Sequence, residues 1–191
     1  MACLKGSKTE KNLLAAFAGE SQARNRYTYF ASIAKKAGYE QIAAIFLDTA
    51  ENEKEHAKRY FKFLEGGMVE IQAKYPAGVL GETVENLKGA AAGEHEEWTK
   101  LYKEAGDVAE AEGFKDVAVA FRSISKVEEQ HEKRYRKLIE NLEKSKVFKK
   151  DVPVKWKCRN CGFVHEGKEA VEKCPACLHP QAFFEVLGEN Y

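Results

Sequence analysis

The sequence predicts an all-α four-helix bundle over residues 1–148, followed by a small, mostly β or loop metal domain over residues 149–191. The chain of 191 residues has only four prolines, and two of them lie in the last twenty residues. Long helices can therefore form before that point, because proline is the residue that interrupts them most strongly. Four of the five cysteines lie between residues 158 and 177, where the composition also becomes rich in aromatic residues.

Glycines divide the first part of the chain into four helical stretches. The expected helices span about residues 7–36, 39–65, 82–111 and 113–145. Ser7 and Glu10 have the spacing of a capping box at the start of the first helix, and Gly38 ends it. Gly113 marks the turn between the last two helices. The connection over residues 68–81 is the long one, so the layout is that of a ferritin-like bundle with one crossover.

The two halves of the bundle repeat each other. Ala18-Gly19-Glu20 matches Ala92-Gly93-Glu94, and Glu53-Lys54-Glu55-His56 matches Glu128-Glu129-Gln130-His131 at an offset that is larger by one. We expect this one-residue slip to lie at a helix end or turn. Two copies of one helical hairpin, related by a pseudo-twofold axis, would contribute equivalent side chains to a site on that axis.

One glutamate of each expected helix lies among apolar residues at helical spacing. These four glutamates are Glu20, Glu53, Glu94 and Glu128. Any one of them alone could equally be an ordinary solvated glutamate. Burying four carboxylates without compensation is very costly, and metal cations neutralise them directly. The Glu-x-x-His pairs, ending at His56 and His131, complete the dinuclear carboxylate pattern, whose oxygen and imidazole ligands suit iron or manganese.

The second half of the bundle carries one additional candidate ligand. Glu97 corresponds to Ala23 in the first half. One iron is therefore predicted to bind either Glu97 or His56, depending on its charge, since a ferric ion prefers the carboxylate and a ferrous ion prefers the imidazole. Tyr27 and Tyr102 lie two turns beyond the first glutamate of each half. The pattern favours core aromatic residues here, and the alternative is a phenol that bonds to a ligand carboxylate.

The last forty residues are too few to bury a sufficient core without a metal or a crosslink. Cys158-x-x-Cys161 and Cys174-x-x-Cys177 have the spacing of a tetrahedral four-sulfur metal site. Spacing alone favours structural zinc, whereas iron would make the same site a one-electron carrier. Cys3 has no partner in the sequence and is interpreted as an incidental thiol.

Charge and hydropathy exclude other classes. The 31 basic and 30 acidic residues give a net charge of +1, which argues against a nucleic-acid-binding surface. The longest apolar run, residues 42–47, is too short to cross a membrane, and the N-terminal residues lack the apolar core of a signal peptide. A cytoplasmic location is therefore expected.

Together, these motifs resemble the rubrerythrin family, in which a ferritin-like diiron bundle precedes a rubredoxin-like domain. The resemblance implies iron at the four cysteines and a bridged diiron centre. It implies these ligand roles: Glu53 and Glu128 bridging, Glu20 with either Glu97 or His56 on one iron, and Glu94, Glu97 and His131 on the other. It also implies a homo-oligomer, expected to be a head-to-tail dimer, in which the four-cysteine centre of one chain approaches the diiron centre of another.

The activity implied is that of a peroxidase that reduces hydrogen peroxide to water and protects against oxidative stress. Electrons would enter through the four-cysteine iron from an external donor, such as rubredoxin or an NAD(P)H-dependent reductase. Glu97 and His56 would act through their redox-dependent exchange, and Tyr27 and Tyr102 through contacts with ligands. Two alternatives are a ferroxidase or iron-handling protein and an electron-transfer or zinc-stabilised protein. A diiron oxygenase is less favoured, because nothing in the sequence identifies a pocket for an organic substrate.

Overall fold

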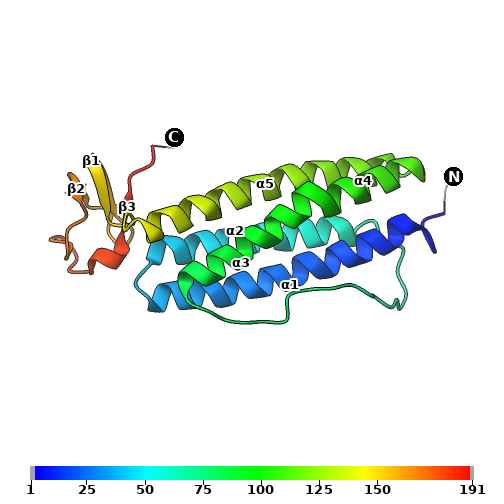
Figure 1. The fold of residues 1–191 in the computed structure, drawn as a ribbon, viewed down its shortest axis with the longest axis horizontal. Helices are drawn as coiled ribbons and strands as arrows, with labels where there is room; N and C mark the ends of the chain where they lie inside the picture. The colour runs from blue at the N-terminus through cyan, green and yellow to red at the C-terminus, as the bar shows by residue number, and fades with distance from the viewer. Residues whose placement is uncertain (1–2, 190–191) are drawn as a thin grey trace.

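The computed structural model describes residues 3–189 and has the expected class of fold, a four-helix bundle followed by a small three-stranded sheet (Figure 1). The third rod of the bundle consists of two α-helices joined by one π-helical turn. The elements are α1 (Lys8–Lys36), α2 (Glu40–Phe61), α3 (Thr83–Glu96), η1 (Glu97–Leu101), α4 (Tyr102–Ala111), α5 (Lys115–Glu143), β1 (Lys149–Cys158), β2 (Val164–Glu169), the short 3-10 helix η2 (Gln181–Phe183) and β3 (Phe184–Val186).

The start of α1 has only half of the expected capping box. The Ser7 hydroxyl oxygen accepts a hydrogen bond from the Glu10 backbone N–H at 2.9 Å, as predicted. The Glu10 carboxylate accepts from the backbone N–H of Gly6 instead of that of Ser7, at 2.7 Å. A carboxylate from the far end of α4 completes the cap, because Glu112 accepts from the backbone N–H and the hydroxyl of Thr9. Negative charge at this position is favourable for the helix dipole.

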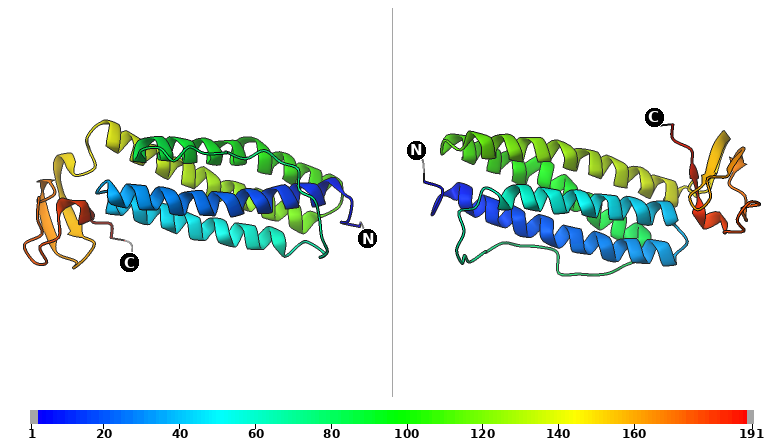
Figure 2. Two further views of the ribbon diagram at one scale, coloured as in Figure 1. Left: turned by 90° about the horizontal axis from the view of Figure 1, so that it is seen from below. Right: turned by 180° about the vertical axis from the view of Figure 1, so that it is seen from behind.

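The crossover segment between α2 and α3 is longer than predicted. Helix α2 ends at Phe61, and residues 62–82 form neither helix nor strand. This segment runs along the outside of the bundle beside α1 (Figures 1 and 2). The Tyr75 hydroxyl donates a hydrogen bond to the backbone oxygen of Ala15 at 2.5 Å, which fixes the segment against α1.

The π-helical turn explains the slip in the repeat. Counted from Glu20 to Glu94 the offset between the halves is 74, whereas counted from Tyr27 to its match Tyr102 it is 75. The backbone N–H of Tyr102 donates to the oxygen of Glu97, five residues earlier, which is the bond that defines a π turn. The prediction that the slip lies at a helix end or turn is therefore wrong. The extra residue lies inside the third helical rod.

Two apolar clusters fill the bundle, one toward each end. One cluster includes Tyr27, Phe30, Phe46 and Tyr135, and the other includes Leu13, Tyr60, Tyr102 and Phe121. The buried glutamates come from the stretch of helix between these two clusters. The polar layer is thus enclosed along the bundle axis by aromatic side chains.

The C-terminal domain lies at the end of the bundle where α2 begins and α5 ends (Figure 1). Its antiparallel sheet has the strand order β2-β1-β3, with Trp156 opposite His165 on one side and Val186 on the other. The rings of Tyr39 and Phe148 stack with centroids 6.1 Å apart, at the junction with the bundle. None of the described helices is long and apolar enough to cross a membrane.

Candidate metal centres

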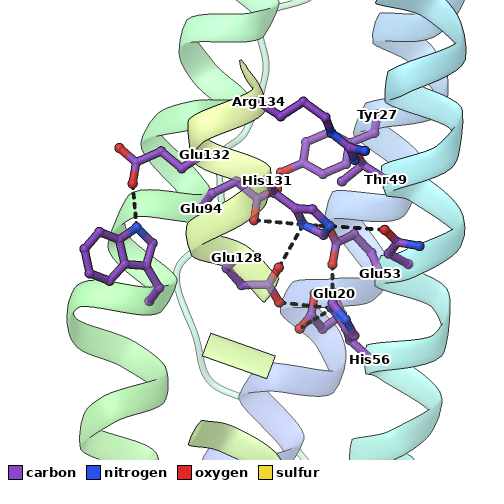
Figure 3. A network of polar contacts seen from close by, with 12 residues as sticks. Glu20, Tyr27, Thr49, Glu53, His56, Glu94, Glu128, His131, Glu132 and Arg134 are labelled. Atoms are coloured by element: carbon purple, nitrogen blue, oxygen red, sulfur yellow. Dashed lines mark hydrogen bonds and ion pairs between the residues drawn. The ribbon is translucent and has the colours of Figure 1, made fainter. Parts of the chain in front are cut away.

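Four helical elements each bury one glutamate at mid-bundle (Figure 3). The exposed fraction is 1% or less for all four of them, which are Glu20 from α1, Glu53 from α2, Glu94 from α3 and Glu128 from α5. Each lies on the apolar face of its helix, because at least half of the residues three, four and seven positions away belong to the two apolar clusters. The helix periodicity therefore directs all four carboxylates to one layer.

The side chains form two adjoining groups, one around each histidine (Figure 3). Nδ1 of His56 lies 2.9 Å from Glu53 Oε2, 3.0 Å from Glu128 Oε1 and 3.8 Å from Glu20 Oε1. Nδ1 of His131 lies 3.2 Å from Glu53 Oε1, 2.9 Å from Glu128 Oε2 and 3.6 Å from Glu94 Oε2. Glu53 and Glu128 thus give one oxygen to each group. This is the placement that bridging carboxylates need between two ions.

Hydrogen bonding within the described residues leaves these groups incompletely satisfied. Among the buried atoms without a hydrogen-bond partner are Glu20 Oε2, Glu53 Oε1, Glu94 Oε2, both oxygens of Glu128 and Nδ1 of His131. One imidazole N–H cannot serve the three carboxylate oxygens around it. The orphaned atoms are lone-pair donors directed to two common points, and the donor set of carboxylates and imidazoles suits iron. The residues therefore fit a pair of metal ions.

Without cations, the charges of this layer shift its pKa values strongly. Burial raises the pKa of Glu20 well above its ordinary value, and burial with the nearby charge of Glu53 raises that of Glu94 to about 8. Burial opposes the charged forms of Glu53 and His56 too, but their contacts outweigh it. Close contacts with both histidines lower the pKa of Glu53 to about 2, and contacts with Glu128 and Glu53 raise that of His56 to about 9. In the metal-free chain, bound protons therefore supply part of the positive charge that metal ions would supply to this layer.

Two tyrosines hold the outer carboxylates across the pseudo-twofold axis. The Tyr27 hydroxyl donates to Glu94 Oε1 and the Tyr102 hydroxyl donates to Glu20 Oε1, both at 2.6 Å and both buried. Each tyrosine therefore donates its hydrogen bond to the glutamate of the other half of the repeat. The structure has the alternative that the sequence pattern disfavoured, a phenol bonded to the carboxylate, in addition to aromatic packing.

Glu97, the extra candidate ligand, belongs to neither four-residue group. It is half-buried in the π turn and lines a cavity of about 320 Å³ beneath the crossover segment. Other lining residues include Gly19, Arg26, Tyr75 and Tyr102. Burial, and then the charge of Glu94, raise the pKa of Glu97 well above its ordinary value. The carboxyl group therefore stands between the metal-binding layer and the cavity.

Two contacts of this layer escaped the sequence analysis. Oδ1 of Asn52 lies 3.1 Å from Nε2 of His131. Glu132 is 6% exposed and accepts hydrogen bonds from the Trp98 indole and the Arg136 guanidinium. Asn52 has no motif of its own, and its partner lies in the other half of the repeat. Glu132 does carry a signal, because it is four residues from Glu128 and so shares its buried helix face.

The four cysteines of the C-terminal domain form a compact sulfur cage. Their Sγ atoms lie within 4.8 Å of one another, with Cys158 3.8 Å from Cys177 and Cys161 3.6 Å from Cys174. A tetrahedral metal site with bonds of about 2.3 Å has sulfur–sulfur edges of about 3.8 Å. The cage therefore fits one metal ion. Cys3 is exposed and takes no part in it.

Comparison with known proteins finds family matches in two parts of the chain. Residues 11–139 match the family described as "Rubrerythrin", and residues 156–185 match "Rubrerythrin, rubredoxin-like domain". The chain is 61% identical to the rubrerythrin of Porphyromonas gingivalis, over 98% of this chain and 94% of that protein. It is 55% identical to the rubrerythrin of Nitratidesulfovibrio vulgaris over the full length of both. A structure of fully reduced, all-ferrous nigerythrin matches with a TM-score of 0.60 and 30% identity, covering 96% of this chain and 91% of that one.

Proposed function

The chain belongs to the rubrerythrin family, and from this premise we propose that it is a peroxidase that reduces hydrogen peroxide to two molecules of water and so protects against oxidative stress. Its bundle carries the diiron carboxylate–histidine site of this family, and its C-terminal domain carries the four-cysteine site. One observation carries the proposal: two metal-binding groups share Glu53 and Glu128, beside a cavity lined by Glu97.

The two groups give the ligands of each ion. One ion would take Glu20 and His56, the other would take Glu94 and His131, and Glu53 and Glu128 would bind both. Two ferrous ions held there supply Lewis acidity and the two electrons that cleavage of the peroxide O–O bond consumes. The reaction also consumes two protons, which the protein must deliver to a site enclosed by aromatic side chains.

Glu97 is the residue best placed to deliver protons. It lines the cavity, and burial and the charge of Glu94 raise its pKa, which favours the protonated form of the carboxyl group in the metal-free chain. A carboxylic acid in this position would donate a proton to the peroxide oxygen that leaves, and would then regain a proton from the solvent side of the cavity. Tyr27 and Tyr102 hold Glu94 and Glu20 in one orientation while this happens.

Glu97 and His56 would also exchange as ligands when the charge of one ion changes. His56 has a counterpart, His131, in the other half, whereas Glu97 does not, so the ligand set is unequal at the two ions. Glu97 lies in the π turn, an irregularity that is rare within helices and frequently found at functional sites. The cavity gives the side chain space to move.

The position of the four-cysteine site favours transfer of electrons between chains. Glu143 at the end of α5 is twelve residues beyond His131, so α5 alone extends about 18 Å past the diiron site. The C-terminal domain, which contains the sulfur cage, lies beyond that end (Figure 1). We propose a head-to-tail homodimer, in which the cage of one chain approaches the diiron site of the other. An external donor such as rubredoxin or an NAD(P)H-dependent reductase would reduce the cage.

The proposal is tested by anaerobic rapid mixing of the fully reduced protein with hydrogen peroxide and, separately, with oxygen. The signal is the visible absorbance of ferric thiolate at the four cysteines. We expect fast colour formation with peroxide and slow formation with oxygen. Equal rates would overturn the peroxidase in favour of a ferroxidase or oxidase. Absence of colour with peroxide would indicate a zinc-filled or electronically isolated cage.

A further inference from the structure

The imidazole groups of the two histidines are supported unequally. Nε2 of His131 lies 3.1 Å from Oδ1 of Asn52, so it donates its proton to that oxygen. A neutral imidazole carries one proton, and Nδ1 of His131 therefore keeps its lone pair. That lone pair faces the common point of Glu53, Glu94 and Glu128. Asn52 thus selects the tautomer and the ring orientation that metal binding needs.

His56 has no such support. The repeat that aligns Glu53 with Glu128 places Val127 at the position that corresponds to Asn52. A valine side chain cannot accept a hydrogen bond, and within residues 3–189 Nε2 of His56 makes none. Its side chain is 12% exposed, against 4% for His131. The ring of His56 is therefore oriented only by packing and by the carboxylates at its Nδ1.

The difference is confined to one position of an otherwise matched set. Glu53 matches Glu128 and His56 matches His131, yet a hydrogen-bond acceptor precedes the first glutamate and an apolar residue precedes the second. Asn52 and Val127 line the same surface pocket, together with His131. The asparagine of α2 thus acts on the histidine of α5 and not on the histidine of its own helix.

We propose that Asn52 is a positioning residue that makes His131 the permanent imidazole ligand, and that Val127 leaves His56 free to be the imidazole that departs. This inference rests on the ligand exchange in the proposed function, because it explains why the exchange occurs at one ion only. It assigns the choice of ion to two residues that touch no metal.

The test is a reciprocal exchange of the two residues in the full-length protein. Asn52→Val gives the first half the valine of the second, and Val127→Asn gives the second half the asparagine of the first. Asn52→Gln is the conservative control, because it keeps a hydrogen-bond acceptor. The zinc-loaded proteins are compared by two readouts. One is the number of exchange-protected imidazole N–H protons in nitrogen-15 NMR spectra, and the other is the affinity of each bound zinc in competition with a chelator. Helical circular dichroism and zinc binding at the four cysteines establish that each variant is folded.

Wild-type protein should show one protected imidazole N–H in the bundle, from His131. Asn52→Val should lose it and should weaken one bundle zinc by about 10- to 100-fold, while the other zinc is unchanged. Asn52→Gln should restore most of both signals. Val127→Asn should add a second protected proton, from His56, and in the iron-loaded protein should suppress the change in coordination between redox states.

The positioning role would be overturned if the Asn52→Val variant kept the protected imidazole N–H proton and both bundle zinc affinities of the wild-type protein. Equal weakening of both zinc ions would overturn it too, because it would show a general loss of structure. These readouts do not depend on peroxide turnover. If the wild-type protein fails as a peroxidase and the asymmetry persists, only the proposed function is lost.

Discussion

Metal-free protein should lose stability as the pH rises from about 5 to about 8. The clearest contribution comes from Glu94, which is fully buried and has a folded-state pKa of about 8 against an ordinary value of 4.5. Between these two values the folded protein holds a proton that the unfolded chain has released. The free energy of unfolding must then fall with rising pH. The contribution of Glu94 is complete below about pH 4.5 and is gone by about pH 8.

The size of the effect follows from the window. One proton changes the free energy of unfolding by about 1.4 kcal/mol per pH unit, so Glu94 alone accounts for about 3 kcal/mol between pH 5 and pH 7. In a protein of this size that is a fall of about 10 °C in Tm. Glu20 and His56 act in the same direction, because their pKa values are also raised. Glu53 acts in the opposite direction, but its window lies below pH 4.5.

The measurement is thermal unfolding, followed by helical circular dichroism, of chelator-treated protein at several pH values between 5 and 8. Glu94→Gln is the matched control, because it keeps the shape of the side chain and removes its titration. In this variant the slope of Tm against pH should be smaller by the amount that one titrating proton contributes. Zinc-loaded protein should show the opposite slope, since metal ions compete with protons for the same atoms. A Tm of the metal-free protein that is constant or rises with pH would refute the reasoning.

Three further predictions concern single side chains. Tyr27→Phe and Tyr102→Phe should each lower the free energy of unfolding by about 2 kcal/mol. They should also weaken metal binding to similar extents, since the two hydrogen bonds are related by the pseudo-twofold axis. Thermal melts and chelator competition measure the two effects, and an effect confined to one variant would contradict the symmetry. Glu97→Ala should change the coordination of oxidised iron and spare that of reduced iron, as seen by Mössbauer spectroscopy; wild-type coordination in both states would exclude the ligand exchange. Cys161→Ser should abolish metal binding in the C-terminal domain and expose it to limited proteolysis, whereas the melting of the bundle should be unchanged.

The site was predictable where it depends on helix periodicity alone. Glu53 has Phe46, Ala50 and Ala57 on its own face of α2, and these neighbours place it inside the bundle without reference to any other helix. The internal repeat supplied the rest, because Glu20 and Glu53 of the first half have matching glutamates, Glu94 and Glu128, in the second. The cysteine spacing was equally local. These features need only the distances along one helix or one loop.

Features that depend on contacts between helices were not predictable. The offset between the halves changes between Glu94 and Tyr102, but the sequence does not show that the extra residue there forms a π turn inside a continuous helical rod. Its Trp98 indole donates a hydrogen bond to Glu132 on α5, a contact between helices that the sequence does not indicate. Similarly, whether Tyr27 and Tyr102 bond to a carboxylate depends on how two rods are aligned along their axes.

Two departures from symmetry distinguish the two metal positions, and they arise in different halves of the chain. In the second half, Glu97 at the start of the π turn stands where the first half has Ala23, which increases the number of ligands available to one ion. Asn52 in the first half acts on His131 and fixes the ligand of the other ion. Neither change would suffice alone: an extra carboxylate beside two fixed histidines has no vacancy to fill, and an unsupported histidine without a replacement would only weaken its ion. On the proposed mechanism, a duplicated hairpin becomes a site with one constant and one variable ion because both changes are present.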